Sequence, residues 1–296
     1  MTDLSFNSVI QEFLTELFSV KRVSQNTITA YRNDLVQFSN FCTEQNKTSV
    51  VQISERLIRL YIIKLNDDNL VRSSISRKLS AVRGLMNYLH RKDILSINPI
   101  STIQNPKSRR KLPETLDLDS YLKILDIINE DYDEDNSTIV IFELLYGSAL
   151  RVSELCNLNL TDFDTDRRTL RILGKGDKTR YVPVGEKSFI VLNKYLSTRN
   201  NPTQLEPLLL TNTGRRIYPR YVRRVVNKYI SKVSDISKKS PHVLRHSAAT
   251  HMLDRGADLI AVKEILGHEN LSTTQIYTQV SVERLKKTYK LAHPKS

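Results

Sequence analysis

The feature that most constrains the fold is a break in apolar periodicity over residues 105–116, NPKSRRKLPETL. Two prolines bracket four basic side chains there, and apolar residues do not recur at helical spacing. Proline restricts the residue before it to extended conformations, so the segment predicts an extended linker. We therefore expect a helical N-terminal domain at residues 1–104, a basic linker at 105–113 and a second domain at 114–296.

Residues 5–103 have the pattern of packed helices. Apolar side chains recur at three- and four-residue spacing in four segments, which predicts four helices with one buried face each. The predicted stripes are Phe13, Leu14, Leu17 and Phe18; Ile28, Tyr31, Leu35, Phe38 and Phe41; Leu57, Leu60, Tyr61 and Ile63; and Ile75, Leu79, Val82, Leu85, Met86 and Leu89. The last segment carries Arg77, Lys78 and Arg83 on its polar side, where they form either a solvated face or a face that contacts phosphate.

The second domain mixes helices with a small sheet. Residues 137–147, STIVIFELLYG, are apolar on nearly all sides and predict a buried central helix that ends at Gly147. Residues 169–173 and 179–184 are rich in β-branched side chains and flank GKGDK, which predicts a hairpin. The segment PLLL at 207–210 suggests an additional edge strand. The expected fold class is mainly α with a small antiparallel β-sheet.

A basic helix is predicted within residues 215–233. Arg220, Arg223 and Arg224 fall on one side, and valines fall on the other. An arginine face backed by a valine face suits a helix that lies against a DNA groove. Arg220, Arg223 and Arg224 are therefore candidate DNA contacts, as are Lys107, Arg109 and Arg110 of the linker, which could run along a DNA backbone.

The net charge points to a polyanionic partner. A formal charge of +13 favours nucleic acid first and an anionic membrane surface second. The two cysteines, Cys42 and Cys156, lie far apart in sequence, which argues against a disulfide framework and a cysteine-rich zinc site and fits a reducing cytoplasm. The first residues are too polar for a signal peptide, and the sequence holds no apolar run of about 18 residues. We expect a cytoplasmic protein.

Residues 240–280 predict three short helices that carry polar side chains at their ends. Ser240 is a candidate N-cap with Pro241 in the first turn. Asp258 opens a second helix, which Gly267 closes. Ser272 and Gln275 have the form of a capping box, so a tyrosine at position 277 falls early in a third helix.

The polar residues of this stretch, together with two from earlier in the chain, could handle a phosphodiester. Helical geometry puts His242 and Arg245 within roughly 60° of each other, so both can face one anion. Arg151 and Arg245 could clamp the non-bridging oxygens and stabilise the charge of a five-coordinate transition state.

A nucleophile and its proton carriers complete this chemistry. A tyrosine hydroxyl has an ordinary pKa of about 10, so Tyr277 needs help from a base and nearby positive charge. His242 and His268 suit the roles of base and hydrogen-bond donor. Lys175, in a glycine-flanked turn, could protonate the leaving 5′ oxygen.

In this order, these residues resemble the signature of the tyrosine recombinase (phage integrase) family: Arg, Lys, His-x-x-Arg, His and Tyr. The matching segments are ALRVSEL, GKGDKTR, PHVLRHSAATHML, ILGH and STTQIYTQV. The likeness covers essentially the whole chain and is greatest to the bacterial Xer recombinases; integrases of mobile elements have the same chemistry. Ala149 stands where the family often has a glycine.

The resemblance implies a two-domain clamp, in which a helical core-binding domain precedes a catalytic domain with a terminal tail helix. It also implies a tetramer, built from this chain or with a paralogous recombinase, on double-stranded DNA recombination sites. Tyr277 would form a 3′-phosphotyrosine, and exchange would pass through a Holliday junction without ATP, metal or another cofactor. Glu154 would support the site. Resolution of chromosome or plasmid dimers and control by a DNA translocase at the septum are also implied; a membrane partner is not.

Three alternatives remain open at this point. His242 and His246 have the spacing of zinc ligands, and His251 is near, although position 243 is valine rather than the glutamate of a zincin. A DNA-binding protein without catalysis and a relaxing activity of the type IB topoisomerase kind are the others.

Overall fold

A computed structural model describes residues 5–20, 23–106, 114–131, 137–174, 179–199, 203, 206–267 and 292. The chain divides into two compact units, Met1–Lys111 and Leu112–Ser296, and each has its own apolar core. In the part of the chain so described, no helix is long and apolar enough to cross a membrane.

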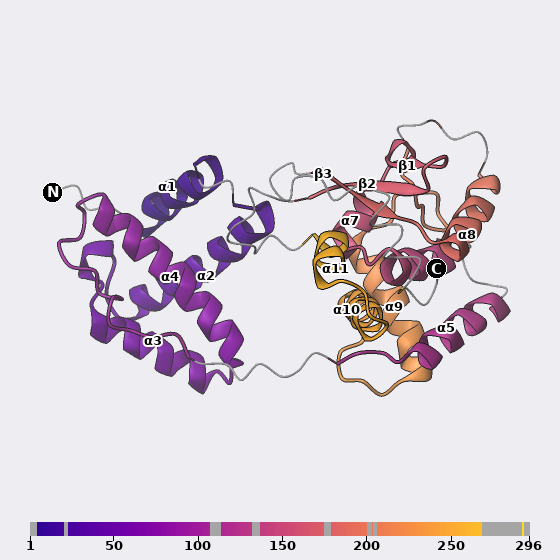
Figure 1. The fold of residues 1–296 in the computed structure, drawn as a ribbon. Coiled ribbons are helices and arrows are strands. Elements are labelled where there is room, and N and C mark those ends of the chain that lie inside the picture. Colours follow the sequence, from indigo (N-terminus) through magenta and orange to yellow (C-terminus); the bar gives the residue numbers. More distant parts are fainter. Residues whose placement is uncertain are drawn as a thin grey trace. The chain divides into compact units, whose positions relative to one another are not determined.

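The first unit is a bundle of helices (Figure 1). Its elements are α1 Phe6–Ser19, α2 Gln25–Glu44, the 3-10 turn η1 Val50–Gln52, α3 Glu55–Asp67 and α4 Arg72–Arg91. Helices α1, α2 and α3 begin after serines 5, 24 and 54, whose hydroxyls accept a backbone N–H of the first turn. The four predicted stripes supply most of the core, but Phe18, Leu60 and Ile63 are exposed, because each lies beside rather than on the buried face of its helix.

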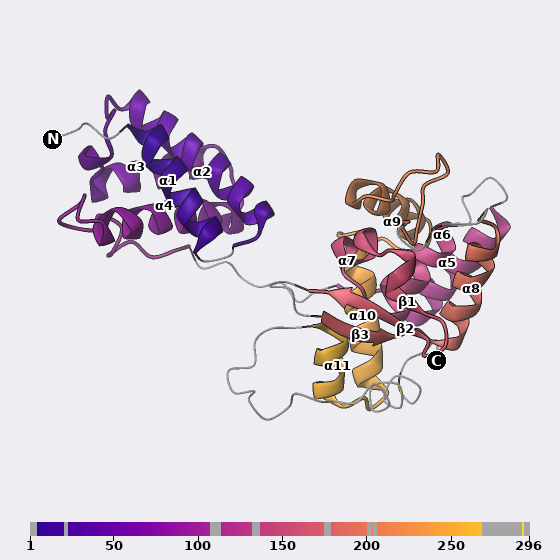
Figure 2. The ribbon, with the colours of Figure 1, turned by 90° about the horizontal axis from the view of Figure 1, so that it is seen from above.

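The second unit combines helices with a small antiparallel sheet (Figures 1 and 2). Its elements are α5 Leu118–Glu130, α6 Ser137–Phe142, η2 Glu143–Gly147, α7 Val152–Asn157, η3 Leu160–Asp162, β1 Phe163–Asp164, β2 Thr169–Leu173, β3 Thr179–Pro183, α8 Glu186–Ser197, α9 Pro219–Val233, α10 Pro241–Asp254 and α11 Leu259–Leu266. The strands are antiparallel in the order β1-β2-β3, and Ile172 pairs with Arg180. The predicted fold class and hairpin are confirmed.

The prediction of an edge strand at residues 207–210 is wrong. Pro207 and Leu210 make only isolated bridges, to Asn159 and Arg216 respectively. The segment's buried side chains, Leu208 and Leu209, are adjacent rather than alternating, so it packs as an irregular connection.

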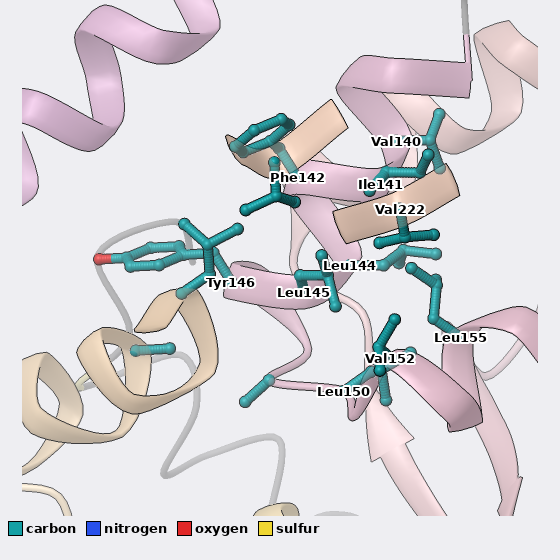
Figure 3. Close-up of a cluster of buried hydrophobic side chains, with 14 of the residues drawn as sticks. Val140, Ile141, Phe142, Leu144, Leu145, Tyr146, Leu150, Val152, Leu155 and Val222 are labelled. Atoms are coloured by element: carbon teal, nitrogen blue, oxygen red, sulfur yellow. The ribbon is translucent and has the colours of Figure 1, made fainter. Parts of the chain in front are cut away.

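The core of the second unit is centred on residues 137–147, as predicted, and Figure 3 shows the side chains that pack there. The segment is not one uniform helix: α6 gives way to a π-helical turn, η2, over its last five residues. In η2 the ring of Tyr146 stacks on Tyr121 with 3.8 Å between centroids, and its hydroxyl lies 2.7 Å from Nδ1 of His251 on α10. A π-helical turn is uncommon, and here it leads directly into the loop that holds Arg151.

Candidate active site

Arg151 occupies the N-cap position of α7, and Glu154 lies one turn later. One carboxylate oxygen of Glu154 accepts the backbone N–H of Arg151 at 2.8 Å, and the other accepts Nη1 of Arg151 at 2.7 Å. The carboxylate thus caps the helix and also fixes the guanidinium of the residue that starts it.

Glu154 also binds two arginines from distant segments. Arg180 of β3 donates Nη1 and Nη2 to the two carboxylate oxygens, at 2.8 and 2.9 Å. Nη1 of Arg245, on α10, lies 3.7 Å from the carboxylate. We call Arg151, Arg180, Arg245 and Glu154 the arginine cluster. Three positive charges therefore surround a single negative one.

The C-terminal end of α11 holds the same three arginines from another direction. The carbonyl of Ile265 accepts Nε of Arg180 at 3.2 Å, and the carbonyl of Gly267 accepts Nη2 of Arg151 at 2.8 Å. Between them, the carbonyl of Leu266 accepts Nη2 of Arg245. The last carbonyls of a helix have no intrahelical partner and carry partial negative charge, so they suit guanidinium donors.

Arg245 is buried, whereas Arg151 is only partly covered. The side chain of Arg245 is 7% exposed and that of Arg151 is 35% exposed. Burial, reinforced by repulsion from Arg151, lowers the pKa of Arg245 to about 10, so it stays charged at neutral pH. Burial opposes ionisation of Glu154, but the hydrogen bonds from Arg180 and Arg151 outweigh it and lower the pKa of Glu154 to about 2. The cluster therefore keeps an excess of positive charge, which an anion would neutralise.

His242 stands beside this charge at the start of α10. Ser240 is the N-cap, as predicted, with Pro241 in the first turn, although the serine side chain makes no capping hydrogen bond. His242 as a whole residue is exposed, but its ring is partly buried. This partial burial, and then the charges of Arg245, Arg223 and Arg151, lower its pKa. A neutral imidazole at pH 7 can accept a proton.

The loop before Arg151 contains a backbone conformation that is unusual for its residue. Ala149 has φ +49° and is fully buried, and its carbonyl accepts Nη1 of Arg245. Left-handed backbone is costly for every residue but glycine. This geometry gives a physical reason why glycine would suit this position.

We expect Ala149→Val to lower the free energy of unfolding by more than about 2 kcal/mol, because a β-branched side chain tolerates left-handed backbone poorly and would overpack the site. Ala149→Gly is the matched control. It loses a buried methyl group but relieves backbone strain, and these terms are of similar size, so its stability should stay within about 1 kcal/mol of wild type. Urea denaturation of the two variants measures both effects, and a Val variant as stable as the Gly variant would contradict the prediction.

Arg180 is absent from the residues that the sequence predicts for the site. The signal that could have found it is the two-residue alternation of β3, in which Arg180 shares a face with the buried Val182. A charged side chain on the inward face of a strand requires a partner, and Glu154 is that partner.

Several predicted site residues lie outside the described residues: Lys175, His268 and Tyr277, the linker residues Lys107, Arg109 and Arg110, and the tail helix. The structure brings together Arg151, Arg245 and Glu154 of the predicted set. The predicted helix bounds around them hold, since Asp258 is the N-cap of α11 and Gly267, with φ +61°, ends it.

The candidate DNA contacts of the second unit lie on α9. Val222, Val225 and Val226 are buried, and Arg220, Arg223 and Arg224 are exposed, as their spacing predicts. An exposed arginine face remains available to a phosphate backbone, so these three residues stay candidates.

The candidates of the first unit are already engaged within the bundle. Arg77 and Lys78 both pair with the buried Asp34, and the side chain of Lys78 is only 11% exposed. Arg83 donates to the side chain of Asn105 and to the carbonyl of Ile103, each at 2.6 Å. Of the two side chains that pair with Asp34, that of Arg77 is the more exposed, at 46%.

Two family models match the chain. One, described as the phage integrase family, matches residues 114–284, and the other, described as the phage integrase N-terminal SAM-like domain, matches residues 10–93. The chain is 38% identical over 303 residues to "Tyrosine recombinase XerC" of Thermodesulfovibrio yellowstonii, covering 100% of this chain and 99% of that protein. A protein of the same name from Pelobacter propionicus is 38% identical over 289 residues, covering 97% and 95%.

Solved structures share the fold. A lambda integrase dimer bound to a COC′ core site has a TM-score of 0.72 at 16% identity, covering 94% of this chain and 100% of that one. XerH bound to its difH substrate in a pre-cleavage complex has a TM-score of 0.65 at 22% identity, covering 95% and 94%. The two-unit layout is thus one that known proteins also adopt.

Proposed function

The chain belongs to the phage integrase family and is a tyrosine site-specific recombinase, and from this premise we propose that the arginine cluster and Tyr277 carry out its DNA cleavage. The observation that supports this site is the convergence of Arg151 and Arg245 on one carboxylate and one helix end. These two arginines lie 94 residues apart in sequence, and the fold brings them together.

The arginine cluster forms a binding site for the scissile phosphate. Arg151 retains exposed surface, and both guanidiniums keep donors beyond those used by the protein. Their fixed charge stabilises the additional negative charge that develops on the non-bridging oxygens when the phosphorus becomes five-coordinate. Because Glu154 and α11 already hold the guanidiniums, little reorganisation is needed when the reaction occurs.

The remaining steps are proton transfers. The hydroxyl oxygen of Tyr277 attacks phosphorus, and the bond from phosphorus to the 5′ oxygen breaks. Neutral His242, assisted by His268, accepts the tyrosine proton, and Lys175 donates a proton to the leaving 5′ oxygen. The products are a 3′-phosphotyrosine and a free 5′-hydroxyl, and attack by the partner strand's 5′-hydroxyl reverses the same steps.

The relatives named XerC favour a recombinase that resolves chromosome or plasmid dimers, and integration of a mobile element is the second candidate. We assign residues 1–104 to core-site binding and 114–296 to catalysis, with the 105–113 segment as the linker. The active assembly is a tetramer of this chain or of this chain with a paralogue. Its reaction passes through a Holliday junction intermediate. The assembly works in the cytoplasm and is controlled by a DNA translocase at the septum.

A nicked suicide substrate tests the proposed function. Duplexes selected for tight binding from a randomised pool are 5′-labelled, and a nick is placed just 3′ of the candidate cleavage point. After cleavage the short 5′-hydroxyl fragment diffuses away, so the labelled strand stays joined to the protein and migrates slowly on a denaturing gel. Failure to form this adduct on any selected duplex would refute the proposed function.

Cleavage is expected to survive removal of divalent metals. The arginines supply the positive charge that a metal would otherwise provide, and Nδ1 of His251 is engaged by Tyr146. The initial rate of adduct formation in excess EDTA should stay within about twofold of the untreated rate, since an effect smaller than that is below about 0.4 kcal/mol. A loss of adduct that added zinc restores would instead support the zinc-hydrolase alternative.

A further inference from the structure

Arg180 differs from the two other arginines of the cluster in how its donors are used. Both terminal nitrogens bind Glu154, and Nε binds the carbonyl of Ile265. Its side chain is 16% exposed, less than half the exposed fraction of Arg151. Each nitrogen atom of the guanidinium therefore donates to the protein, and the side chain is more covered than that of Arg151.

We propose that Arg180 is a positioning residue for DNA cleavage, which holds Glu154 and the end of α11 in the arrangement that presents Arg151 to the phosphate. This inference rests on the proposed function of the same site. Arg180 itself makes no contact with the substrate and acts through groups that do.

The shared contacts explain how Arg180 reaches Arg151. The same oxygen of Glu154 accepts Nη1 of Arg151 and Nη1 of Arg180, at 2.7 and 2.8 Å. The second anchor of Arg151, the carbonyl of Gly267, lies two residues after the carbonyl that binds Arg180. Arg180 thus contacts both groups that anchor the Arg151 guanidinium, Glu154 directly and the end of α11 through Ile265, so loss of its side chain loosens both.

The space around Arg180 is fitted to its flat guanidinium. A Cβ atom added to Gly267 would lie 3.0 Å from Cζ, Nε and Nη1 of Arg180, which is closer than ordinary packing allows. Gly267 also has φ +61°, a conformation that favours glycine. The glycine therefore ends α11 and also lets the guanidinium lie against the backbone.

Lysine cannot reproduce this arrangement. It has a single charged nitrogen, which cannot bind both oxygens of a carboxylate in a planar fork and a carbonyl at the same time. A positive charge at this position is therefore not sufficient. We expect both Arg180→Lys and Arg180→Gln to cleave DNA more slowly than wild type.

The test compares Arg180→Gln and Arg180→Lys with Arg171→Gln. Arg171 is the matched control, because it lies on the neighbouring strand β2 and pairs with Asp162 at 2.9 Å through a side chain that is 52% exposed. On the nicked duplex at saturating protein, we expect the rate of adduct formation to fall roughly 10- to 100-fold in Arg180→Gln, because small misplacement of a catalytic group has effects of this size. DNA affinity should remain near wild type, Arg180→Lys should remain slower than wild type, and Arg171→Gln should be unchanged.

A double-mutant cycle identifies the route. If Arg180 acts through Glu154, the pair Arg180→Gln and Glu154→Gln together should be no slower than Glu154→Gln alone. The acid side of the pH–rate profile gives an independent readout. Hydrogen bonds from Arg180 help to keep the pKa of Glu154 low, so in Arg180→Gln the rate should begin to fall at a higher pH than in wild type.

Each outcome decides the matter. Absence of an adduct with wild-type protein refutes the proposed function and this inference with it. An adduct that forms at the wild-type rate in Arg180→Gln leaves the function standing and overturns the inference. Fully additive losses in the cycle overturn the route through Glu154. Rates are taken well below the lowest Tm of the set; if Arg180→Gln fails to fold, Arg180→Lys replaces it, and a wild-type rate in that variant overturns the inference.

Discussion

A Tyr277→Phe variant is expected to bind its DNA site as tightly as wild type and to form no covalent protein–DNA complex. The substitution removes only the hydroxyl oxygen that attacks phosphorus, and it retains the aromatic ring. Arg151, Arg245 and the other groups that hold the phosphate are unchanged. Binding is measured by gel shift under native conditions, and the adduct is measured on the nicked duplex under denaturing conditions.

Tyr181→Phe is a suitable control for this experiment. Tyr181 lies on β3, next to Arg180, and is 47% exposed, so loss of its hydroxyl should leave the adduct unchanged. If the adduct persists in Tyr277→Phe and disappears in Tyr181→Phe, the nucleophile is Tyr181 and not Tyr277. An adduct that persists in both would require a nucleophile other than these two tyrosines.

Replacement of Glu154 by glutamine should have the largest effect on stability among the site residues described here. The Glu154 side chain is 6% exposed and holds Arg151 and Arg180 by direct hydrogen bonds. Its removal leaves buried guanidinium charges without a counterion, a change that typically costs several kcal/mol. The pKa of about 2, compared with an ordinary value near 4.5, corresponds to about 3 kcal/mol at neutral pH.

The pH dependence of this effect follows from the lowered pKa. The folded chain binds the proton more weakly than the unfolded chain, so the stabilisation is complete above the ordinary pKa and is lost as the pH falls toward 2. In urea denaturation, wild type should exceed Glu154→Gln by about 3 kcal/mol at pH 7, and the difference should shrink as the pH falls below about 4.5.

Glu186→Gln provides the comparison within the same unit. Glu186 is 71% exposed and lies 4.0 Å from Arg168, so its replacement should change stability by less than about 1 kcal/mol. If Glu154→Gln were no more destabilising than Glu186→Gln, the arginine cluster would not depend on its carboxylate.

The sequence alone determines the local elements of this protein. Apolar spacing of three and four residues is a property of neighbours along the chain, and it predicts the helices of the first unit and the valine face of α9. Helix ends are local as well, so Ser240, Asp258 and Gly267 mark the bounds of α10 and α11 before any tertiary contact is known.

Other features needed the tertiary structure. The π-helical turn at 143–147 and the left-handed backbone of Ala149 are imposed by packing. A π-helical turn is rare in any sequence, and alanine disfavours left-handed backbone. The two errors of prediction also arise here. They concern the irregular 207–210 segment and the exposed Phe18, Leu60 and Ile63, whose burial depends on which surface covers them.

The active site combines both kinds of information. The order of its residue types along the chain predicts Arg151 and Arg245, since each chemical role requires a particular side chain, and the family resemblance implies Glu154. Their contacts do not follow from spacing: Arg151 meets the carbonyl of Gly267 across 116 residues, and Arg245 meets that of Ala149 across 96. Arg180 illustrates the limit, because the alternation of β3 marks it as an inward-facing charge, but only the fold brings its partners, Glu154 and the end of α11, to it.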